Sequence, residues 1–170
     1  MKIRTGTIED AAAISELVYS LSAKYIAVDF DDEGARNLLA SMETTAIEGY
    51  LTSGFRYHIA EENGIILGVV GVQENKHLYH LFVTESRQKQ GLATELWRVA
   101  REACIAAGNP GEFTVNSSRL VLPFYKKLGF VEAGPPENRG GVIATPMKLT
   151  ENEPHTSHKR PPKSGAAQAV

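Results

Sequence analysis

The sequence contains a single cysteine, Cys104, in 170 residues. This scarcity excludes an intramolecular disulfide and a metal site built from several cysteines. Basic residues are not in excess either, because the formal net charge is -2. Proteins that bind a phosphate backbone usually carry such an excess. We therefore expect no nucleic acid partner and no metal cofactor.

Long hydrophobic runs are also lacking. No apolar run is long enough to cross a bilayer, and the first ten residues, MKIRTGTIED, lack the hydrophobic region of a secretory signal. These absences predict no membrane association and a cytoplasmic location. What is present is ordinary for a globular domain, with 42% hydrophobic and 22% charged residues. The length suits one domain with a substantial core.

The hydrophobic pattern alternates between the periods of strands and helices. The predicted order is strand, two helices, three strands, helix, strand, helix and two strands. This order favours an α/β fold, with one mixed sheet and helices on both of its faces. We place strands at residues 2–7, 55–62, 65–73, 77–84, 112–116, 130–134 and 141–149, and helices at residues 8–28, 32–51, 90–107 and 122–129.

Local signals support several of these boundaries. Asn63 and Gly64 tolerate the positive φ angles of a type I′ turn and therefore predict a hairpin. Asp31 or Asp32 is expected to cap the second helix. The folded domain should span residues 1–149. The remaining residues, 150–170, have almost no large apolar side chains and predict a disordered tail.

The segment QKQGLA, residues 88–93, joins a predicted strand to a predicted helix. A turn with few bulky side chains directs several backbone N–H groups of a helix N-terminus to one point, where they can bind an anion. Gly91 and Ala93 leave that backbone accessible, and Gln88, Lys89 and Gln90 can add donors or positive charge. The alternative is an ordinary helix entry with solvated side chains. A Walker A loop is excluded because it needs Gly-Lys-Ser/Thr, whereas Leu92 follows Gly91 here. A dinucleotide-binding loop is excluded because it needs three glycines and only one is present.

A second segment, FYKKLGF, spans residues 124–130. Together with QKQGLA, in this order and with a helix and a strand between them, it resembles the GNAT (GCN5-related) N-acetyltransferases. The resemblance covers residues 2–149. It implies that the strands at 77–83 and 112–116 splay apart and that the pantetheine arm of acetyl-CoA lies between them. The residues it implies for binding acetyl-CoA are Leu81, Phe82, Val83, Gln88, Lys89, Gln90, Gly91, Leu92, Ala93, Thr94, Asn116, Ser118 and Tyr125.

Acetylation of an amine needs a neutral nucleophile. An alkylammonium group has a pKa of about 10.4, so its neutralisation at pH 7 costs on the order of 4–5 kcal/mol. A general base can supply part of that cost. His77 and His80 are the candidates, and strand alternation puts them on opposite faces unless a bulge intervenes. His77 is preferred because, by the same resemblance, it aligns with a glutamate that serves as the base on this strand in several family members. The alternative is that either histidine only hydrogen-bonds within the sheet.

Tyr125 corresponds, by the same resemblance, to the tyrosine that protonates the departing CoA thiolate. The alternative is a core tyrosine packed with Phe124 and Phe130. Many family members carry an asparagine seven residues before this tyrosine, where the present chain has Ser118. Whether Asn116 or Ser118 contacts pantetheine therefore stays open.

The acceptor side is expected to include the first two helices and their connection. This segment contains Tyr25, Asp29, Phe30, Asp31 and Asp32, whose carboxylates could attract a cationic amine or could simply cap a helix. The sequence thus predicts an acetyl-CoA-dependent N-acetyltransferase acting on a small-molecule or peptide amine by direct transfer. A non-catalytic acyl-CoA-binding sensor is the alternative. By resemblance, the protein could form a homodimer.

Overall fold

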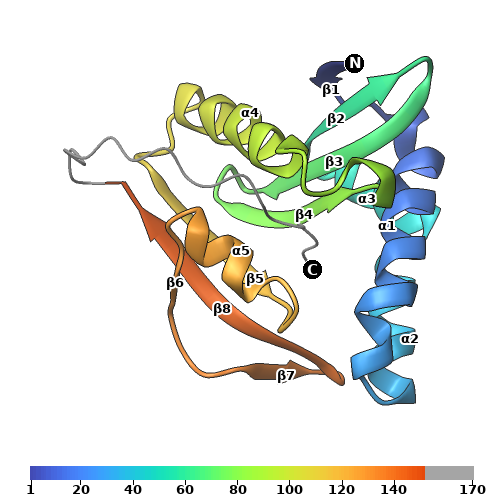
Figure 1. The fold of residues 1–170 in the computed structure, drawn as a ribbon, viewed down its shortest axis with the longest axis vertical. Helices are drawn as coiled ribbons and strands as arrows, with labels where there is room; N and C mark the ends of the chain where they lie inside the picture. Colours follow the sequence, from blue (N-terminus) through green and yellow to red (C-terminus); the bar gives the residue numbers. More distant parts are fainter. Residues whose placement is uncertain (152–170) are drawn as a thin grey trace.

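A computed structural model describes residues 1–151 of the chain (Figure 1). The predicted disordered tail lies outside the described residues, except for Thr150, which ends the last strand, and Glu151. The strands are β1 (Lys2–Thr5), β2 (Arg56–Glu62), β3 (Ile65–Gln73), β4 (His77–Val83), β5 (Glu112–Ser117), β6 (Val131–Glu132), β7 (Glu137–Arg139) and β8 (Val142–Thr150). The helices are α1 (Ala11–Tyr25), α2 (Asp32–Ala40), α3 (Thr44–Thr52), α4 (Leu92–Ala106) and α5 (Leu122–Lys127), with short 3-10 helices η1 (Ile8–Asp10), η2 (Ala27–Asp29) and η3 (Glu85–Arg87).

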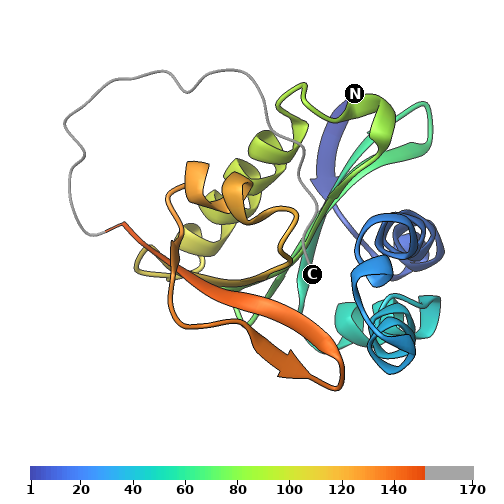
Figure 2. The ribbon, with the colours of Figure 1, turned by 60° about the horizontal axis from the view of Figure 1, so that its bottom comes forward.

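The strands form one mixed sheet in the order β1-β2-β3-β4-β5-β8-β6, and β7 pairs with β8. Neighbouring strands are antiparallel except for β4 and β5, which are parallel. Helices α1 to α3 cover one face and α4 and α5 the other, as the two views show (Figures 1 and 2). The predicted α/β fold with a mixed sheet and helices on both faces is confirmed.

Each face of the sheet has its own hydrophobic core. Under α4 and α5, large buried side chains include Leu96, Trp97, Phe113 and Phe130. Under α1 to α3, they include Ile14, Val18, Leu38, Met42, Ile47, Tyr57, Ile59 and Phe82. Consecutive residues of β4 contribute to both cores, because Leu81 belongs to the first and Phe82 to the second. The central strand is therefore buried on both faces.

The prediction of one helix over residues 32–51 is wrong, because this segment forms two helices, α2 and α3. The Ser41 hydroxyl donates to the carbonyl of Leu38 at 2.6 Å and competes with the continuing helix. Met42 then turns fully into the core, and its carbonyl accepts a 2.7 Å hydrogen bond from Ser15. The N-terminal cap is Asp31, whose carboxylate accepts from the N–H of Gly34.

Strand β7 was not predicted from the sequence. Its residues are all exposed and polar, so they have no alternating pattern that could indicate a strand. The strand exists because Gly140 and Gly141, both with positive φ, reverse the chain and bring β7 against β8. The resulting β7–β8 hairpin contacts α2 from the far end of the sheet (Figure 2).

The segment Ile8–Asp29 is long and apolar enough to cross a membrane by length and composition alone. The expectation that no such run exists was therefore wrong within the described residues. In the structure, however, this segment is a core helix. Ile14, Val18 and Leu21 are buried against the sheet, which accounts for its apolar face.

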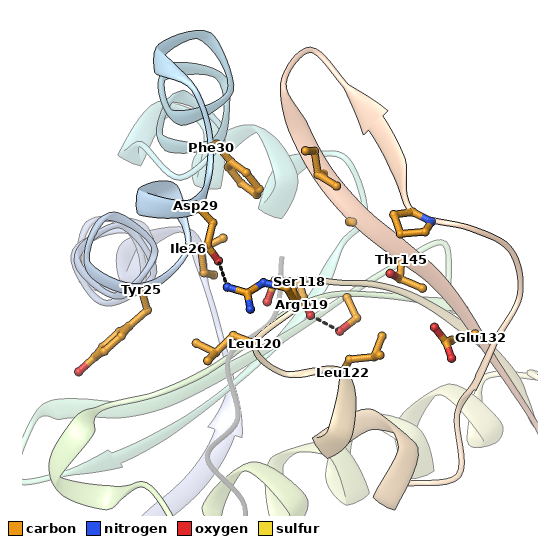
Figure 3. Close-up of a pocket in the computed structure, with 14 residues that line it drawn as sticks. Tyr25, Ile26, Asp29, Phe30, Ser118, Arg119, Leu120, Leu122, Glu132 and Thr145 are labelled. Carbon is orange, nitrogen blue, oxygen red and sulfur yellow. Dashed lines mark hydrogen bonds and ion pairs between the residues drawn. The ribbon is translucent and has the colours of Figure 1, made fainter.

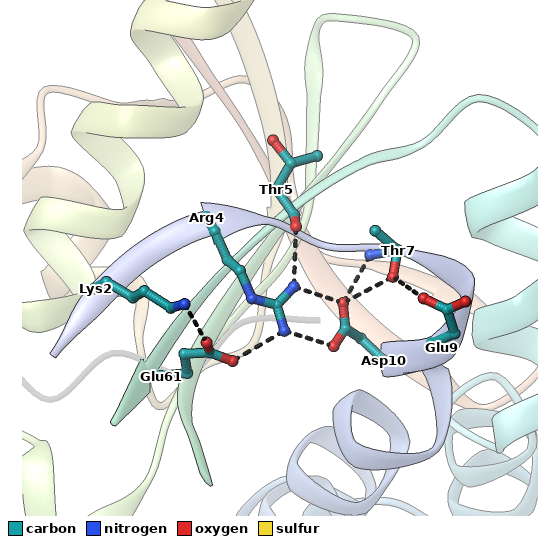
Figure 4. A network of polar contacts seen from close by, with 7 residues as sticks. All are labelled: Lys2, Arg4, Thr5, Thr7, Glu9, Asp10 and Glu61. Atoms are coloured by element: carbon teal, nitrogen blue, oxygen red, sulfur yellow. Dashed lines mark hydrogen bonds and ion pairs between the residues drawn. The ribbon is translucent and has the colours of Figure 1, made fainter. Parts of the chain in front are cut away.

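A polar network fixes the start of α1 (Figure 4). The Arg4 guanidinium donates to both carboxylate oxygens of Asp10 at 2.9 Å and to Glu61 at 2.9 Å. Arg4 holds the pKa of Asp10 and of Glu61 below the usual value. Asp10 also accepts the N–H of Thr7 at 2.7 Å. The network joins β1, β2 and the helix entry, and so it orients α1, whose C-terminal end lies near the candidate site.

Helix α2 and the β7–β8 hairpin meet at a glycine contact. A Cβ atom on Gly34 would lie 2.6 Å from the carbonyl carbon of Gly141. Beside it, Asn37 donates to the carbonyl of Gly140 at 2.6 Å. Only glycine at position 34 allows the two backbones to approach this closely.

We expect Gly34→Ala to lower the free energy of unfolding by about 1–3 kcal/mol, because the added methyl group forces the two backbones apart. Gly49 in α3 is the matched control. A Cβ there meets nothing within 4 Å, so Gly49→Ala should raise the stability by up to about 1 kcal/mol through helix propensity. Urea unfolding measures both changes. Equal stability of Gly34→Ala and the wild type would contradict the glycine contact.

Candidate active site

Strands β4 and β5 separate soon after they start. They pair at two positions, His77 with Thr114 and Leu78 with Val115. Beyond these positions, β4 continues to Val83 paired with β3 alone, while β5 continues to Ser117 paired with β8 alone. The facing edges of the two strands therefore carry backbone groups without a sheet partner. An extended ligand can hydrogen-bond to such edges in the manner of a further strand.

The loop that follows β4 leads into α4 with a bare N-terminus. Gly91 caps the helix with φ 84°, and the first intrahelical bond runs from the N–H of Glu95 to the carbonyl of Gly91. The N–H groups of Leu92, Ala93 and Thr94 precede that bond and have no acceptor within the helix. A side chain at Gly91 would meet nothing within 4 Å. The space over these N–H groups is thus open, which suits an anion.

Side chains of the loop stabilise its own shape. The Gln88 amide donates to the carbonyl of Val83 at 3.0 Å, and the Gln90 amide donates to the carbonyl of Ser86 at 2.9 Å. Lys89 takes a left-handed conformation with φ 60° and is exposed. The two glutamines, which we expected to offer donors to an anion, each use an N–H to close the loop. Lys89 is left as the cationic side chain of this turn.

A bulge in β4 puts both histidines on one face. Gly71 of β3 pairs with His80 and Val72 pairs with Leu78, so Tyr79 is an extra residue. As a result, His77 and His80 both face helices α2 and α3, whereas Leu78 and Leu81 face α4. The conditional expectation of opposite faces does not hold, because the bulge intervenes.

The environments of the two histidines differ strongly. His80 is 1% exposed and bonds through Nδ1 to the hydroxyl of Tyr57 at 2.9 Å. Burial lowers the pKa of His80 to about 3. His77 is half-buried, and its Nδ1 bonds to the Thr114 hydroxyl at 2.7 Å, which leaves Nε2 for another partner. Burial and the charge of Arg139 lower the pKa of His77 more moderately.

His77 lines a pocket with several polar side chains, here called the histidine pocket. Its volume is about 290 Å³. It lies between α2, the start of β4 and the β7–β8 hairpin, and its lining residues include Asn37, Ser41, His77, Tyr79, Asn116, Glu137 and Arg139. Asn116 therefore lies on the same side of β5 as His77. Sequence reasoning missed the β7 residues of this pocket, because that strand had no recognisable pattern.

Tyr125 belongs to the core under α4 and α5, whereas Ser118, just after the end of β5, lines the apolar pocket described below. The Tyr125 side chain is fully buried between Phe124 and Phe130, and its hydroxyl has no hydrogen-bond partner among the described residues. Burial raises the pKa of Tyr125. The Ser118 hydroxyl is likewise buried and has no hydrogen-bond partner among residues 1–151. Unpaired buried hydroxyls are rare and fit a ligand that bonds to them.

A second and larger pocket, here called the apolar pocket, opens next to the end of β5 (Figure 3). Its volume is about 400 Å³. The corner between α1 and α2 forms one side through Tyr25, Asp29 and Phe30. Asp31 and Asp32 do not line it, because they cap and start α2. The pocket shares Ala144 of β8 with the histidine pocket, so the two are neighbours.

Comparison with known proteins identifies the family. Residues 26–151 match the model of the acetyltransferase (GNAT) domain. A search of curated protein sequences found no significant match. Among solved structures, the chain is similar to a GCN5-related N-acetyltransferase from Rhodopseudomonas palustris, with 21% identity, a TM-score of 0.73, and coverage of 88% of this chain and 94% of that chain.

Two further similar structures contain a cofactor. One is the PaiA N-acetyltransferase from Thermoplasma acidophilum in complex with coenzyme A, with 16% identity, a TM-score of 0.70, and coverage of 88% and 99% of the two chains. The other is yncA, a putative acetyltransferase from Salmonella typhimurium with acetyl-CoA, with 22% identity, a TM-score of 0.63, and coverage of 95% and 98%. The chain belongs to the GNAT acetyltransferase family.

Proposed function

We propose that this protein is an acetyl-CoA-dependent N-acetyltransferase that transfers the acetyl group directly to a primary amine of a small molecule or peptide in the cytoplasm. The observation that carries the proposal is the continuous path from the unpaired edges of β4 and β5 to the free N–H groups at Gly91. An extended arm ending in a diphosphate matches such a path. The similar proteins with CoA or acetyl-CoA bound support the same ligand.

The residues that would hold acetyl-CoA fit its chemistry. The N–H groups of Leu92, Ala93 and Thr94, next to Lys89, suit a diphosphate. The backbone of β4 between Leu81 and Val83 suits an amide-containing arm. Ser118, with its unpaired hydroxyl, suits a pantetheine amide better than Asn116, which faces the histidine pocket. The thioester, when bound, supplies an activated acetyl carbon.

Two side chains then divide the proton transfers. His77 accepts a proton from the acceptor's ammonium group, so that a C–N bond can form as the C–S bond breaks. Tyr125 donates a proton toward the departing sulfur, and the nitrogen releases its second proton as the amide forms, which restores the tyrosine hydroxyl. Their separation by β5 suits these roles, because one faces the histidine pocket and the other faces the core under α4 and α5.

Gly91→Glu should weaken acetyl-CoA binding at least about tenfold, equivalent to ~1.4 kcal/mol, because it adds strain at positive φ and a negative charge beside the diphosphate. Gly54→Glu is the matched control. Gly54 also has a positive φ of 91°, and a Cβ there meets nothing within 4 Å. Titration calorimetry with acetyl-CoA compares the two. Unchanged affinity in Gly91→Glu, or an equal loss in Gly54→Glu, would refute the role of the loop.

Tyr125→Phe should lower kcat by about 10²-fold or more, since general acid catalysis contributes on that scale. Its stability should not fall, because the lost hydroxyl has no partner among residues 1–151. Thiol release from acetyl-CoA measures kcat, and thermal unfolding measures stability. An unchanged kcat would reduce Tyr125 to a core residue. Tight acetyl-CoA binding without turnover on any amine would instead support the sensor function.

His77→Asn should lower kcat/KM about 10²-fold near neutral pH, while the amide, which lies at the position of Nδ1, can keep the bond to Thr114. The ratio of wild-type to variant kcat/KM isolates His77, because the acceptor amine ionises equally in both reactions. The ratio should be large when His77 is neutral and decline as the pH falls through its pKa. That decline should lie below pH 6.5, since burial lowers the pKa of His77 from its usual value of about 6.5. A ratio that is independent of pH would exclude His77 as the base.

A further inference from the structure

From the apolar pocket we infer the class of acceptor: a small primary amine with an apolar or aromatic body, rather than a polyamine or an aminoglycoside. The inference rests on the proposed acetyl transfer and specifies its second substrate. A volume of about 400 Å³ is in the range of small-molecule sites, roughly 300–1,000 Å³. The apolar side chains that line it are Ile26, Phe30, Leu120, Leu122, Pro136 and Ile143.

The mouth of the pocket exposes hydrophobic surface. Leu120 is 53% exposed and Ile143 is 44% exposed, and they come from the β5–α5 loop and from β8 respectively. Phe30, on the opposite side, is half-buried (Figure 3). Apolar side chains that converge from separate elements on one cavity indicate a ligand that covers them.

The charges of the lining are already neutralised. Asp29 pairs with Arg119 at 3.3 Å, and Glu132 pairs with Lys126 at 2.9 Å. Two carboxylates thus face two cations, and Figure 3 shows the Arg119 guanidinium turned toward Asp29. A polycation entering here would lose hydration without gaining a free counter-charge. This differs from the sequence expectation that carboxylates of this segment could attract a cationic amine.

The other polar side chains of the lining are the uncharged Tyr25, Ser117, Ser118 and Thr145, and the unpaired hydroxyl of Ser118 is assigned above to the pantetheine arm. The Tyr25 hydroxyl bonds to Glu85 and points away from the pocket (Figure 3). The Ser117 hydroxyl donates to the carbonyl of Ser118. The polar groups that can receive the amine lie instead across Ala144, in the histidine pocket. An acceptor with its body in the apolar pocket therefore has its nitrogen directed toward the end of β5 and His77.

The test compares 2-phenylethylamine with 1,4-diaminobutane at fixed acetyl-CoA. The wild type should acetylate phenylethylamine with a kcat/KM at least about tenfold higher, because burial of an aromatic ring favours the first amine by about that factor or more. Leu120→Asp should raise the KM for phenylethylamine about tenfold and leave the KM for acetyl-CoA unchanged. Ile143→Asp, from a different element, should act in the same direction. Ile65→Asp is the control, since Ile65 is 64% exposed on the β2–β3 hairpin and lies outside the pocket.

The other outcomes are distinct. A diamine used as well as or better than phenylethylamine would overturn the inference while acetyl transfer stands. A hexanoyl-CoA KM raised by Leu120→Asp, with an unchanged amine KM, would assign the pocket to a longer acyl chain and also overturn it. Thiol release with other primary amines but with neither of these two would overturn the inference alone, whereas no release with any amine, although acetyl-CoA binds, would overturn the proposed function as well.

Discussion

The divergence of β4 from β5 is the constraint on which the rest of the structure depends. In a sheet, the backbone N–H and C=O groups of each strand normally hydrogen-bond to the neighbouring strands. Here the hydrogen bonding between β4 and β5 ends after Leu78 and Val115. The gap is held by side chains instead. Leu81 and Val83 on one strand and Phe113 and Val115 on the other belong to a single buried cluster under α4 and α5. The hydrophobic core thus joins the two halves of the sheet where hydrogen bonds do not.

The same constraint explains the features that surround the gap. Because β5 leaves β4, it pairs with β8 along its whole length, from Glu112 with Thr150 to Ser117 with Thr145. The bulge at Tyr79 lies immediately beyond the last β4–β5 pair and turns His80 into the core under α1 to α3. The loop after Val83 is tied to the strand end by Gln88. The open edges, the bulge and the helix N-terminus therefore form one connected unit.

Much of this could be predicted from the sequence, where a local pattern has a single structural meaning. Asn63 and Gly64 adopt positive φ and form the expected hairpin, and Gly91 adopts positive φ at the start of α4. The division of residues 32–51 into two helices could not be predicted, because Ser41 and Met42 break the helix through a side-chain bond and a tertiary contact. Strand β7 depends on its partner β8 rather than on its own residues.

The candidate site shows the same division. Positions around Gly91 were predicted from the resemblance of QKQGLA to the family motif, but the contacts of Gln88 and Gln90 could be read only from the loop geometry. The bulge could not be predicted from the sequence, because the residues of β4, HLYHLFV, are typical of a strand with or without an extra residue. Without the bulge, alternation would have separated His77 from His80. The preference for Ser118 over Asn116 likewise required the structure, because the Ser118 hydroxyl is buried without a partner among the described residues, whereas Asn116 faces the histidine pocket.

Burial assigns opposite proton roles to the two side chains proposed for catalysis. Removal from water disfavours the charged form of any group, so it raises the pKa of a tyrosine and lowers that of a histidine. Tyr125 accordingly keeps its proton at neutral pH, and His77 keeps a free lone pair. His80 shows the limit of this effect. Its complete burial makes it so weak a base, with a pKa of about 3, that it can serve the packing of Tyr57 but not proton transfer near pH 7. The partial exposure of His77 therefore supports its proposed role as the base, in contrast to the structural histidine three residues away.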